Sequence, residues 1–168
     1  HRNLGFMQIS EVKNKDQEKA FLDVARALYK NDPEWVCPLD SDIDAVFDPS
    51  KNTFYQHGEA TRWILKNDQG SVIGRIAAFI NEKKANYGDK RIGGIGFFEC
   101  IDDSAAANLM FDTAVESQGK IFLSTELRGG GSVTPYAVQV GDNGVCNVLN
   151  KLGVAKIGKS KYTKYNCK

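Results

Sequence analysis

The stretch Ala60-Thr-Arg-Trp-Ile-Leu65, Lys66-Asn-Asp-Gln-Gly70 and Val72-Ile-Gly-Arg-Ile-Ala-Ala-Phe-Ile80 carries the clearest structural signal in this 168-residue sequence. Its first and last parts have the composition of strands. The polar segment between them ends in Gly70, which can adopt the positive φ that a tight turn requires. The stretch therefore predicts an antiparallel hairpin, with strands over 60–65 and 71–80.

Upstream of this hairpin, the sequence predicts a strand and two helices. Apolar and polar residues alternate imperfectly over 6–12, which indicates a strand. Asn14 or Asp16 can cap the helix that follows, and this helix ends before Pro33 because proline disfavours helix in the preceding residue. Its apolar residues recur three and four apart, so it buries one face; they are Ala20, Phe21, Val24, Ala25 and Leu28. Residues 41–47 predict a second, short helix.

Downstream, a polar loop is predicted over 81–90 and a strand over 92–101, whose three glycines weaken or bulge it. Asp102-Asp103-Ser104 provides helix N-cap residues, and Gly119 ends that helix. The remaining predicted elements are strands over 121–127 and 133–140, a flexible loop at Gly129–Gly131, a helix over 143–152, and one or two strands over 155–165. Together these elements predict an α/β (α+β) fold with a mixed, mainly antiparallel central sheet flanked by helices.

The composition fits one domain with a real core. There are 22 Lys plus Arg and 21 Asp plus Glu, and a net charge of +1 argues against a strongly basic nucleic-acid binder. No apolar run reaches the ~20 residues of a membrane span, so no membrane partner is expected. The four cysteines, at 37, 100, 146 and 167, form no C-x-x-C pair, and with two histidines no metal site is expected. Free thiols in a reducing, cytoplasmic compartment are the expectation.

Both ends of the chain carry separate expectations. The N-terminus lacks the apolar core of a signal peptide, and His1 is not an initiator. Residues 1–6 are therefore expected to be a cloning remnant, with 7–168 as one domain. The last 18 residues hold six lysines and no acid, which indicates an exposed edge strand protected by lysines; a site for a phosphate-bearing ligand is the alternative. An exposed terminal strand also allows a homodimer that joins two sheets.

Four short motifs accompany this element order: Leu28-Tyr-Lys-Asn-Asp-Pro-Glu-Trp-Val36, Phe47-Asp-Pro-Ser-Lys-Asn52, Arg75-Ile-Ala-Ala78 and Gly96-Phe-Phe-Glu99. In combination they resemble the GNAT acetyltransferase superfamily, and within it a branch of mostly hypothetical bacterial proteins. The resemblance covers residues 7–117. The segment Asn143–Val154 is also similar to a GNAT segment, with Val154 where the family has Phe. An acyl-CoA N-acyltransferase-like fold is what the resemblance implies.

The resemblance further implies an acetyl-CoA site. In GNAT proteins the strands that correspond to 92–101 and 121–127 splay apart, the pantetheine arm pairs with the first of them, and the pyrophosphate sits on the next helix N-terminus. The implied cofactor-binding residues are Phe97, Phe98, Cys100, Ile101, Ser104, Ala105, Ala106 and Asn143. The phosphate loop of the family has an Arg or Gln and glycines, whereas this chain has Asp102 and Asp103, which would repel a pyrophosphate. Plain helix caps are the alternative reading.

Glu99 is the implied general base, which in the family often deprotonates the amine through water. Burial beside Phe97 and Phe98 would raise the pKa of its carboxyl group, which suits a base. A strand-edge glutamate paired with a lysine is the alternative. Tyr162 is the implied general acid for the departing thiolate, with half-buried packing in a strand as its alternative.

Other residues are also candidates for chemistry, and two further hypotheses for the whole chain stay open. Tyr165 and Tyr136 are the other options for the acid, while His57 and Cys100 lack an obvious partner motif. The leading hypothesis is an acyl-CoA-dependent N-acyltransferase that acts on a small-molecule amine or a protein amino group. The alternative is a catalytically inactive GNAT-like binding or interaction module. An RNA-contacting domain that uses the lysine-rich tail is a third, minor hypothesis.

Overall fold

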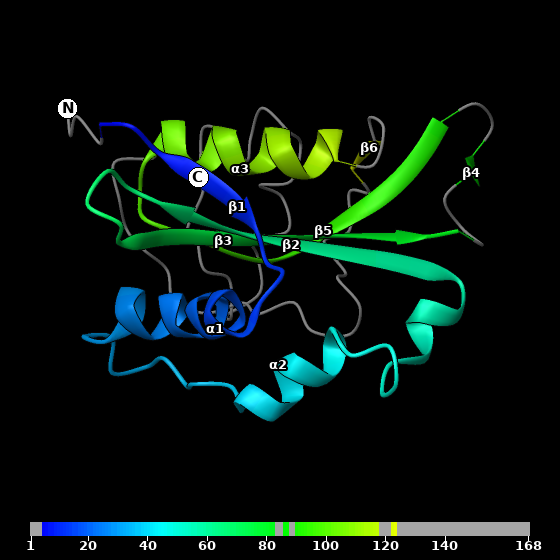
Figure 1. Ribbon diagram of the computed structural model, residues 1–168, viewed down its shortest axis with the longest axis horizontal. Coiled ribbons are helices and arrows are strands. Elements are labelled where there is room, and N and C mark those ends of the chain that lie inside the picture. Colours follow the sequence, from blue (N-terminus) through cyan, green and yellow to red (C-terminus); the bar gives the residue numbers. More distant parts are fainter. Residues whose placement is uncertain (1–4, 83–85, 88–89, 118–121, 124–168) are drawn as a thin grey trace.

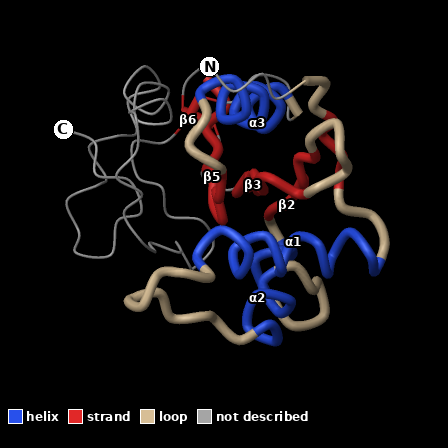
Figure 2. The backbone as a smooth tube through the Cα atoms, turned by 90° about the vertical axis from the view of Figure 1, so that its left-hand side faces the viewer, coloured by secondary structure: helices blue, strands red, loops and turns tan. Residues whose placement is uncertain are grey.

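The computed structural model describes residues 5–82, 86–87, 90–117 and 122–123. A sheet lies between two helical layers, with α1 and α2 on one face and α3 on the other (Figures 1 and 2). In chain order the elements are β1 (Gln8–Glu11), α1 (Lys15–Tyr29), α2 (Asp40–Val46), a 3-10 helix η1 (Thr53–Gln56), β2 (Gly58–Lys66), β3 (Val72–Asn81), β4 (Asn86–Tyr87), β5 (Lys90–Cys100), α3 (Ser104–Glu116) and β6 (Phe122–Leu123).

The predicted fold class is confirmed. Strand order in the sheet is β1-β2-β3-β5-β4, and β6 also pairs with β5. The β5–β6 pair is parallel and the other described pairs are antiparallel, so the sheet is mixed and mainly antiparallel. The predicted hairpin is present: β2 and β3 pair along their lengths, and Gly70 has φ +79° in the turn that joins them.

The predicted start of α1 is also confirmed, with Asn14 as the cap. Its side chain accepts a hydrogen bond from the Gln17 backbone N–H at 2.9 Å, while the Gln17 side chain accepts one from the Lys13 N–H at 2.7 Å. The first bond satisfies one of the backbone donors that a helix start leaves unpaired, and the second joins the residue before the cap to the first turn. The helix then buries Phe21, Val24, Ala25 and Tyr29 against the sheet.

Two predictions for the elements need correction. The polar loop predicted over 81–90 contains β4, which pairs with the first residues of β5, so that β5 begins at Lys90 rather than at Ile92. Backbone pairing at a sheet edge requires no apolar side chains, and polar residues are common there. The sequence also gave no sign of η1, which Asn52 caps by accepting from the Phe54 N–H at 3.0 Å.

Beyond α3, the predictions lie mainly outside the described residues. The strand predicted over 121–127 is described as β6 at Phe122–Leu123. The strands expected over 133–140 and 155–165, the helix over 143–152 and the loop at Gly129–Gly131 all lie outside the described residues.

The two faces of the sheet support separate hydrophobic clusters. The α3-side cluster includes Trp63, Leu65 and Ile76 from the sheet, with Met110 and Phe111 from α3. The α1-side cluster combines residues of α1 and α2 with residues of the sheet, and its buried members are Phe21, Ile43, Ile64, Ala77, Phe79 and Phe97. Burial of this apolar area from both sides is the main stabilising contribution to the fold.

Candidate functional site

The central strand β5 is bulged near its carboxyl end. Its pairing with β3 joins Arg75 to Glu99 and Ala77 to Gly96, so two residues of β5 lie between these pairs where β3 has one. Phe97, one of those two, has φ +55°, a conformation that is unusual for a bulky residue. A bulge was expected from the glycines of this strand, but the positive φ falls on the phenylalanine that follows Gly96.

The extra residue changes which side chains share a face of the sheet. Ile95 and Phe98 both belong on the α3 side, and the Phe98 ring lies 4.5 Å from that of Phe111. Phe97 packs on the other face, within the α1-side cluster. A regular strand would have placed Ile95 and Phe97 on the same face. The bulge therefore also determines that Glu99, two residues on, faces α1.

Glu99 lies in a buried polar cluster with Tyr29 and Arg75. Glu99 is 0% exposed. Its carboxylate accepts a hydrogen bond from the Tyr29 hydroxyl group through Oε2. The Arg75 Nη2 lies 3.8 Å from its Oε1. The partners of Glu99 are thus Tyr29 of α1 and Arg75 of β3. The alternative from the sequence, a strand-edge glutamate paired with a lysine, had expected a different partner.

Arg75 contacts both α1 and the bulge of β5. It is 1% exposed and donates from Nε to the Phe97 carbonyl oxygen at 3.1 Å and from Nη1 to the Phe21 carbonyl oxygen at 2.7 Å. Its guanidinium carbon also lies 4.9 Å from the centre of the Phe21 ring, a distance typical of a cation–π contact. Burial lowers the pKa of the Arg75 guanidinium to about 10, so it remains charged at neutral pH.

Arg75 and Tyr29 were not among the residues selected from the sequence. One signal was available: Arg75 is a single charge within the apolar run of 72–80, which the hairpin places in a strand. An arginine is almost never fully buried unless it is paired. Its position therefore indicated an acidic partner on a neighbouring strand, and Glu99 is that partner. No comparable signal marked Tyr29.

The implied cofactor-binding residues have different environments. The side chains of Phe97 and Cys100 are buried in the two clusters, so only their backbone could meet a ligand, whereas Phe98 is partly buried against the α3-side cluster. The Ile101 N–H donates to the Ile73 carbonyl at 3.0 Å and is used within the sheet. At the start of α3, Ser104 and Ala105 are exposed. Tyr162 and Asn143 lie outside the described residues, as do Tyr136 and Tyr165.

The start of α3 is capped by an acid. The Asp103 side chain accepts from the Ala106 N–H at 2.8 Å, so one of the backbone donors that would receive a phosphate is already bonded. Asp102 and Asp103 are both partly exposed. The predicted N-cap function is therefore present, while the carboxylates add negative charge where the resemblance places a pyrophosphate.

Cys37 and Cys100 are free thiols, and Cys100 is buried. Burial raises the pKa of the Cys100 thiol, which disfavours the nucleophilic thiolate. Within the described residues, no group of three or more metal-ligating side chains occurs. No helix in the described part of the chain combines the length and apolar character needed to cross a membrane.

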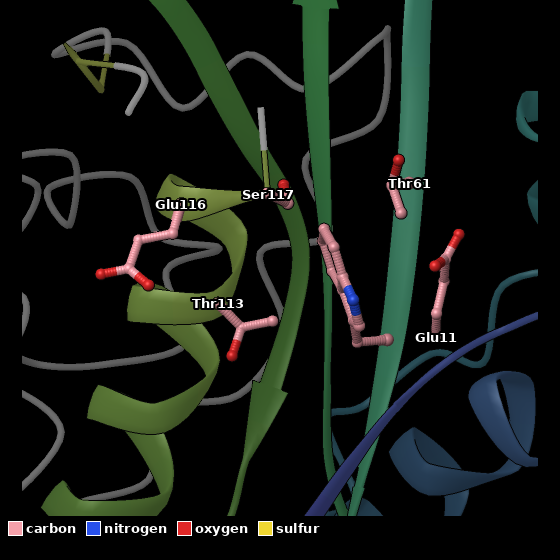
Figure 3. A pocket seen from close by; sticks show the side chains of 6 residues that line it. Glu11, Thr61, Thr113, Glu116 and Ser117 are labelled. Atoms are coloured by element: carbon pink, nitrogen blue, oxygen red, sulfur yellow. The ribbon is translucent and has the colours of Figure 1, made fainter. Parts of the chain in front are cut away.

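A surface hollow of about 490 Å³ lies on the opposite face of the sheet (Figure 3). Thr113 and Glu116 of α3 and Ser117, which caps this helix, line it on one side, and Glu11 and Thr61 come from β1 and β2. Trp63, which belongs to the α3-side cluster, completes the lining. Because Glu99 faces α1, this hollow is separated from the Tyr29–Arg75–Glu99 cluster by the sheet.

Comparison with known proteins gives partial relatives. The chain is 28% identical over 109 residues to the bacterial ceramide synthase of Caulobacter vibrioides, covering 64% of this chain and 28% of that protein. It is 31% identical over 109 residues to the protein YghO of Escherichia coli K12, covering 63% of this chain and 27% of that protein. A 50-residue segment is 48% identical to an N-alpha-acetyl-L-2,4-diaminobutyric acid deacetylase of Halomonas elongata, covering 30% of this chain and 15% of that protein.

The chain thus spans less than a third of the length of each of these relatives. No protein-family model matches it. Among solved structures, a GCN5-related glucosamine N-acetyltransferase region of a fungal multi-domain GH3 β-N-acetylglucosaminidase superposes with a TM-score of 0.58 at 13% identity, covering 88% of this chain and 17% of that one. At this identity the likeness concerns architecture. The chain therefore has the fold of the GCN5-related N-acetyltransferases, the GNAT fold that its motifs resemble.

Proposed function

We propose that this protein is an acyl-CoA-dependent N-acyltransferase. The observation that carries the proposal is the bulge of β5 at Phe97. Along the chain, this bulge follows the β5 residues that pair with the parallel strand β6 and precedes the start of α3. In the GNAT fold this is where an acyl thioester lies along the strand. A bulge interrupts the ladder with β3, so backbone groups of β5 other than the Phe97 carbonyl, which accepts from Arg75, could pair with an amide-rich pantetheine arm.

In the proposed reaction, the amine nitrogen attacks the thioester carbonyl carbon and the C–S bond breaks. The proton of the amine passes to Glu99, and the departing thiolate takes a proton from Tyr162, as implied by the resemblance. Because Glu99 is 0% exposed, the proton travels through a water molecule or through the Tyr29 hydroxyl group that is bonded to the carboxylate. The products are an N-acyl amide and free CoA.

For the acceptor, we propose an amine with a long apolar chain. The support comes from the relative named a bacterial ceramide synthase, which matches 109 residues of this chain. A ceramide is an N-acylated long-chain amino alcohol, so its synthesis forms the same bond as the proposed reaction. A short amine or a protein amino group is the competing acceptor class, and the assay below compares them.

A second candidate function is a GNAT-like module that binds a partner without catalysis. The observation that favours it is the start of α3, where Asp103 caps the Ala106 N–H and contributes a negative charge. Such a helix start is poorly suited to a pyrophosphate. This candidate predicts that the protein does not bind acyl-CoA.

Calorimetric titration with acetyl-CoA and a longer acyl-CoA, followed by transfer assays on short and long-chain amines, tests the proposal. We expect micromolar binding and turnover. In Glu99→Gln, turnover should fall roughly 10²–10⁴-fold with little change in cofactor affinity, because general base catalysis contributes about that much. The matched control is Glu59→Gln, which removes an exposed carboxylate from β2 and should leave both quantities unchanged.

Circular dichroism must accompany this comparison, because Glu99→Gln leaves the Arg75 charge buried without its partner. Folded Glu99→Gln protein with wild-type turnover would contradict the role of Glu99. Absence of binding heat in the wild-type protein would contradict the acyltransferase proposal as a whole and favour the binding module.

A further inference from the structure

One guanidinium group joins α1 to the bulge of β5. Arg75 donates to the carbonyl oxygen of Phe21 in α1 at 2.7 Å and to that of Phe97 in β5 at 3.1 Å. The third nitrogen of the same group lies 3.8 Å from the Glu99 carboxylate. At 1% exposure, these contacts lie away from solvent competition, which strengthens hydrogen bonds made by a charged donor.

The bulge needs such support because its local conformation is unfavourable. Phe97 has φ +55°, and an aromatic residue has no intrinsic preference for this region. Such a conformation persists only where surrounding contacts determine it. The Phe97 ring is fixed by its neighbours in the α1-side cluster, with ring centres 5.2 Å from Phe47 and 6.2 Å from Phe79. Its carbonyl oxygen is fixed by Arg75.

We infer that Arg75 is a positioning residue: it holds Phe97 of the β5 bulge at its positive φ and aligns the Glu99 carboxylate beside it. A lysine cannot replace it, because a single ammonium group does not present the planar fork that reaches two carbonyl oxygens and a carboxylate at once. The part of this inference that concerns catalysis rests on the proposed function. The part that concerns the bulge does not.

Arg75→Lys tests the inference, with Arg62→Lys as the matched control. Arg62 lies on the neighbouring strand β2 and on the same face. Its guanidinium carbon is 4.2 Å from the centre of the Phe47 ring, and its Nη2 is 3.8 Å from the Glu18 Oε1. Both variants keep a positive charge, but Arg75→Lys loses the planar guanidinium group that contacts the Phe97 carbonyl oxygen and the Glu99 carboxylate. Amide hydrogen exchange and backbone chemical shifts are measured for residues 96–100 in both.

We expect amide hydrogen exchange in residues 96–100 of Arg75→Lys to accelerate by about tenfold or more. This is the effect expected from the loss of one charge-assisted hydrogen bond. In Arg62→Lys the same amides should remain within about twofold of the wild-type protein, because this change leaves the bond from Arg75 to the Phe97 carbonyl oxygen in place. Where acyl-CoA is turned over, Arg75→Lys should lower kcat and weaken cofactor binding, whereas Arg62→Lys should leave both close to wild type.

A second variant keeps the test valid if Arg75→Lys does not fold. Arg75→Met combined with Glu99→Met removes both members of the buried ion pair, and apolar replacement of such a pair is often neutral for stability. We expect this double variant to fold with altered chemical shifts at Phe97 and Phe98. Folded variants whose shifts and exchange at the bulge match the wild-type protein would overturn the inference.

The two failures are distinguishable. A wild-type protein that binds no acyl-CoA contradicts the proposed function, but the exchange and shift measurements still report whether Arg75 holds the bulge. Conversely, unchanged bulge amides in Arg75→Lys contradict the positioning role even if the wild-type protein is an active acyltransferase.

Discussion

Cys37 and Cys100 differ in the two properties that control thiol reactivity. Cys37 is exposed, whereas Cys100 is buried in the α3-side cluster. Burial also raises the pKa of the Cys100 thiol, because the thiolate is poorly solvated there. Since the thiolate is the reactive form, the two residues should differ strongly in their rates of alkylation.

We expect iodoacetamide at pH 8 to modify Cys37 in the native protein at least roughly 100-fold faster than Cys100. Peptide mass spectrometry after timed quenching measures each site separately. Denaturant should make the two rates similar, which serves as the control for intrinsic reactivity. Comparable labelling of both thiols without denaturant would show that Cys100 is accessible, and would reopen it as a nucleophile.

At the same scale, Glu99 shows what a residue type and a motif can and cannot predict. The motif Gly96-Phe-Phe-Glu99 selected the residue, and its burial was anticipated, but Phe98 packs on the opposite face of the sheet from Glu99. Its partners were not, because a cross-strand pair with Arg75 depends on the register of β3 and β5, and that register is shifted by the bulge. The contact with Tyr29 depends in addition on how α1 docks, which no local pattern specifies.

Among the elements, α3 presents the sharpest conflict between stability and the proposed ligand. Asp103 caps the helix through the Ala106 N–H and so satisfies one donor, but its charge opposes an incoming pyrophosphate. Asparagine caps a helix about as well as aspartate. Asp103→Asn therefore separates the two effects, because it keeps the cap and removes the charge.

We expect Asp103→Asn to bind acetyl-CoA roughly two- to fivefold more tightly than the wild-type protein, with little change in thermal stability. Calorimetric titration at low and high salt measures this, and salt should reduce the difference. Asp112→Asn is the control: it removes an exposed charge from the same helix about 13 Å further along the axis. Equal affinities in all three proteins would argue against a phosphate site at this helix start.

How well the elements could be predicted depended on whether their signals were local. The β2–β3 hairpin, the cap at Asn14 and the cap at Asp103 are fixed by residues within a few positions of each other, and all three are confirmed. The short strand β4 was missed because its polar sequence resembles a loop and only its pairing defines it. Likewise, the bulge falls on Phe97 because Arg75 and the aromatic cluster hold it there, against the local preference for glycine.

For the molecule as a whole, the sheet separates two hydrophobic clusters. Phe21 belongs to the α1-side cluster and Phe111 to the α3-side cluster, and both are almost fully buried. Phe47 packs against the first cluster, with its ring centre 5.5 Å from that of Phe21. Truncations on opposite faces have no shared contacts, whereas truncations within one cluster change each other's surroundings.

We therefore expect Phe21→Leu and Phe111→Leu, each costing roughly 1–3 kcal/mol in the free energy of unfolding, to add within about 0.5 kcal/mol when combined. The combination of Phe21→Leu with Phe47→Leu should instead deviate from additivity by more than that, because the two rings are in direct contact. Urea unfolding of the single and double variants gives both comparisons. If the pair on opposite faces deviates as much as the contacting pair, the sheet transmits packing changes between its faces. The cluster at Arg75 and Glu99 would then be sensitive to substitutions beneath α3 as well as to those beneath α1.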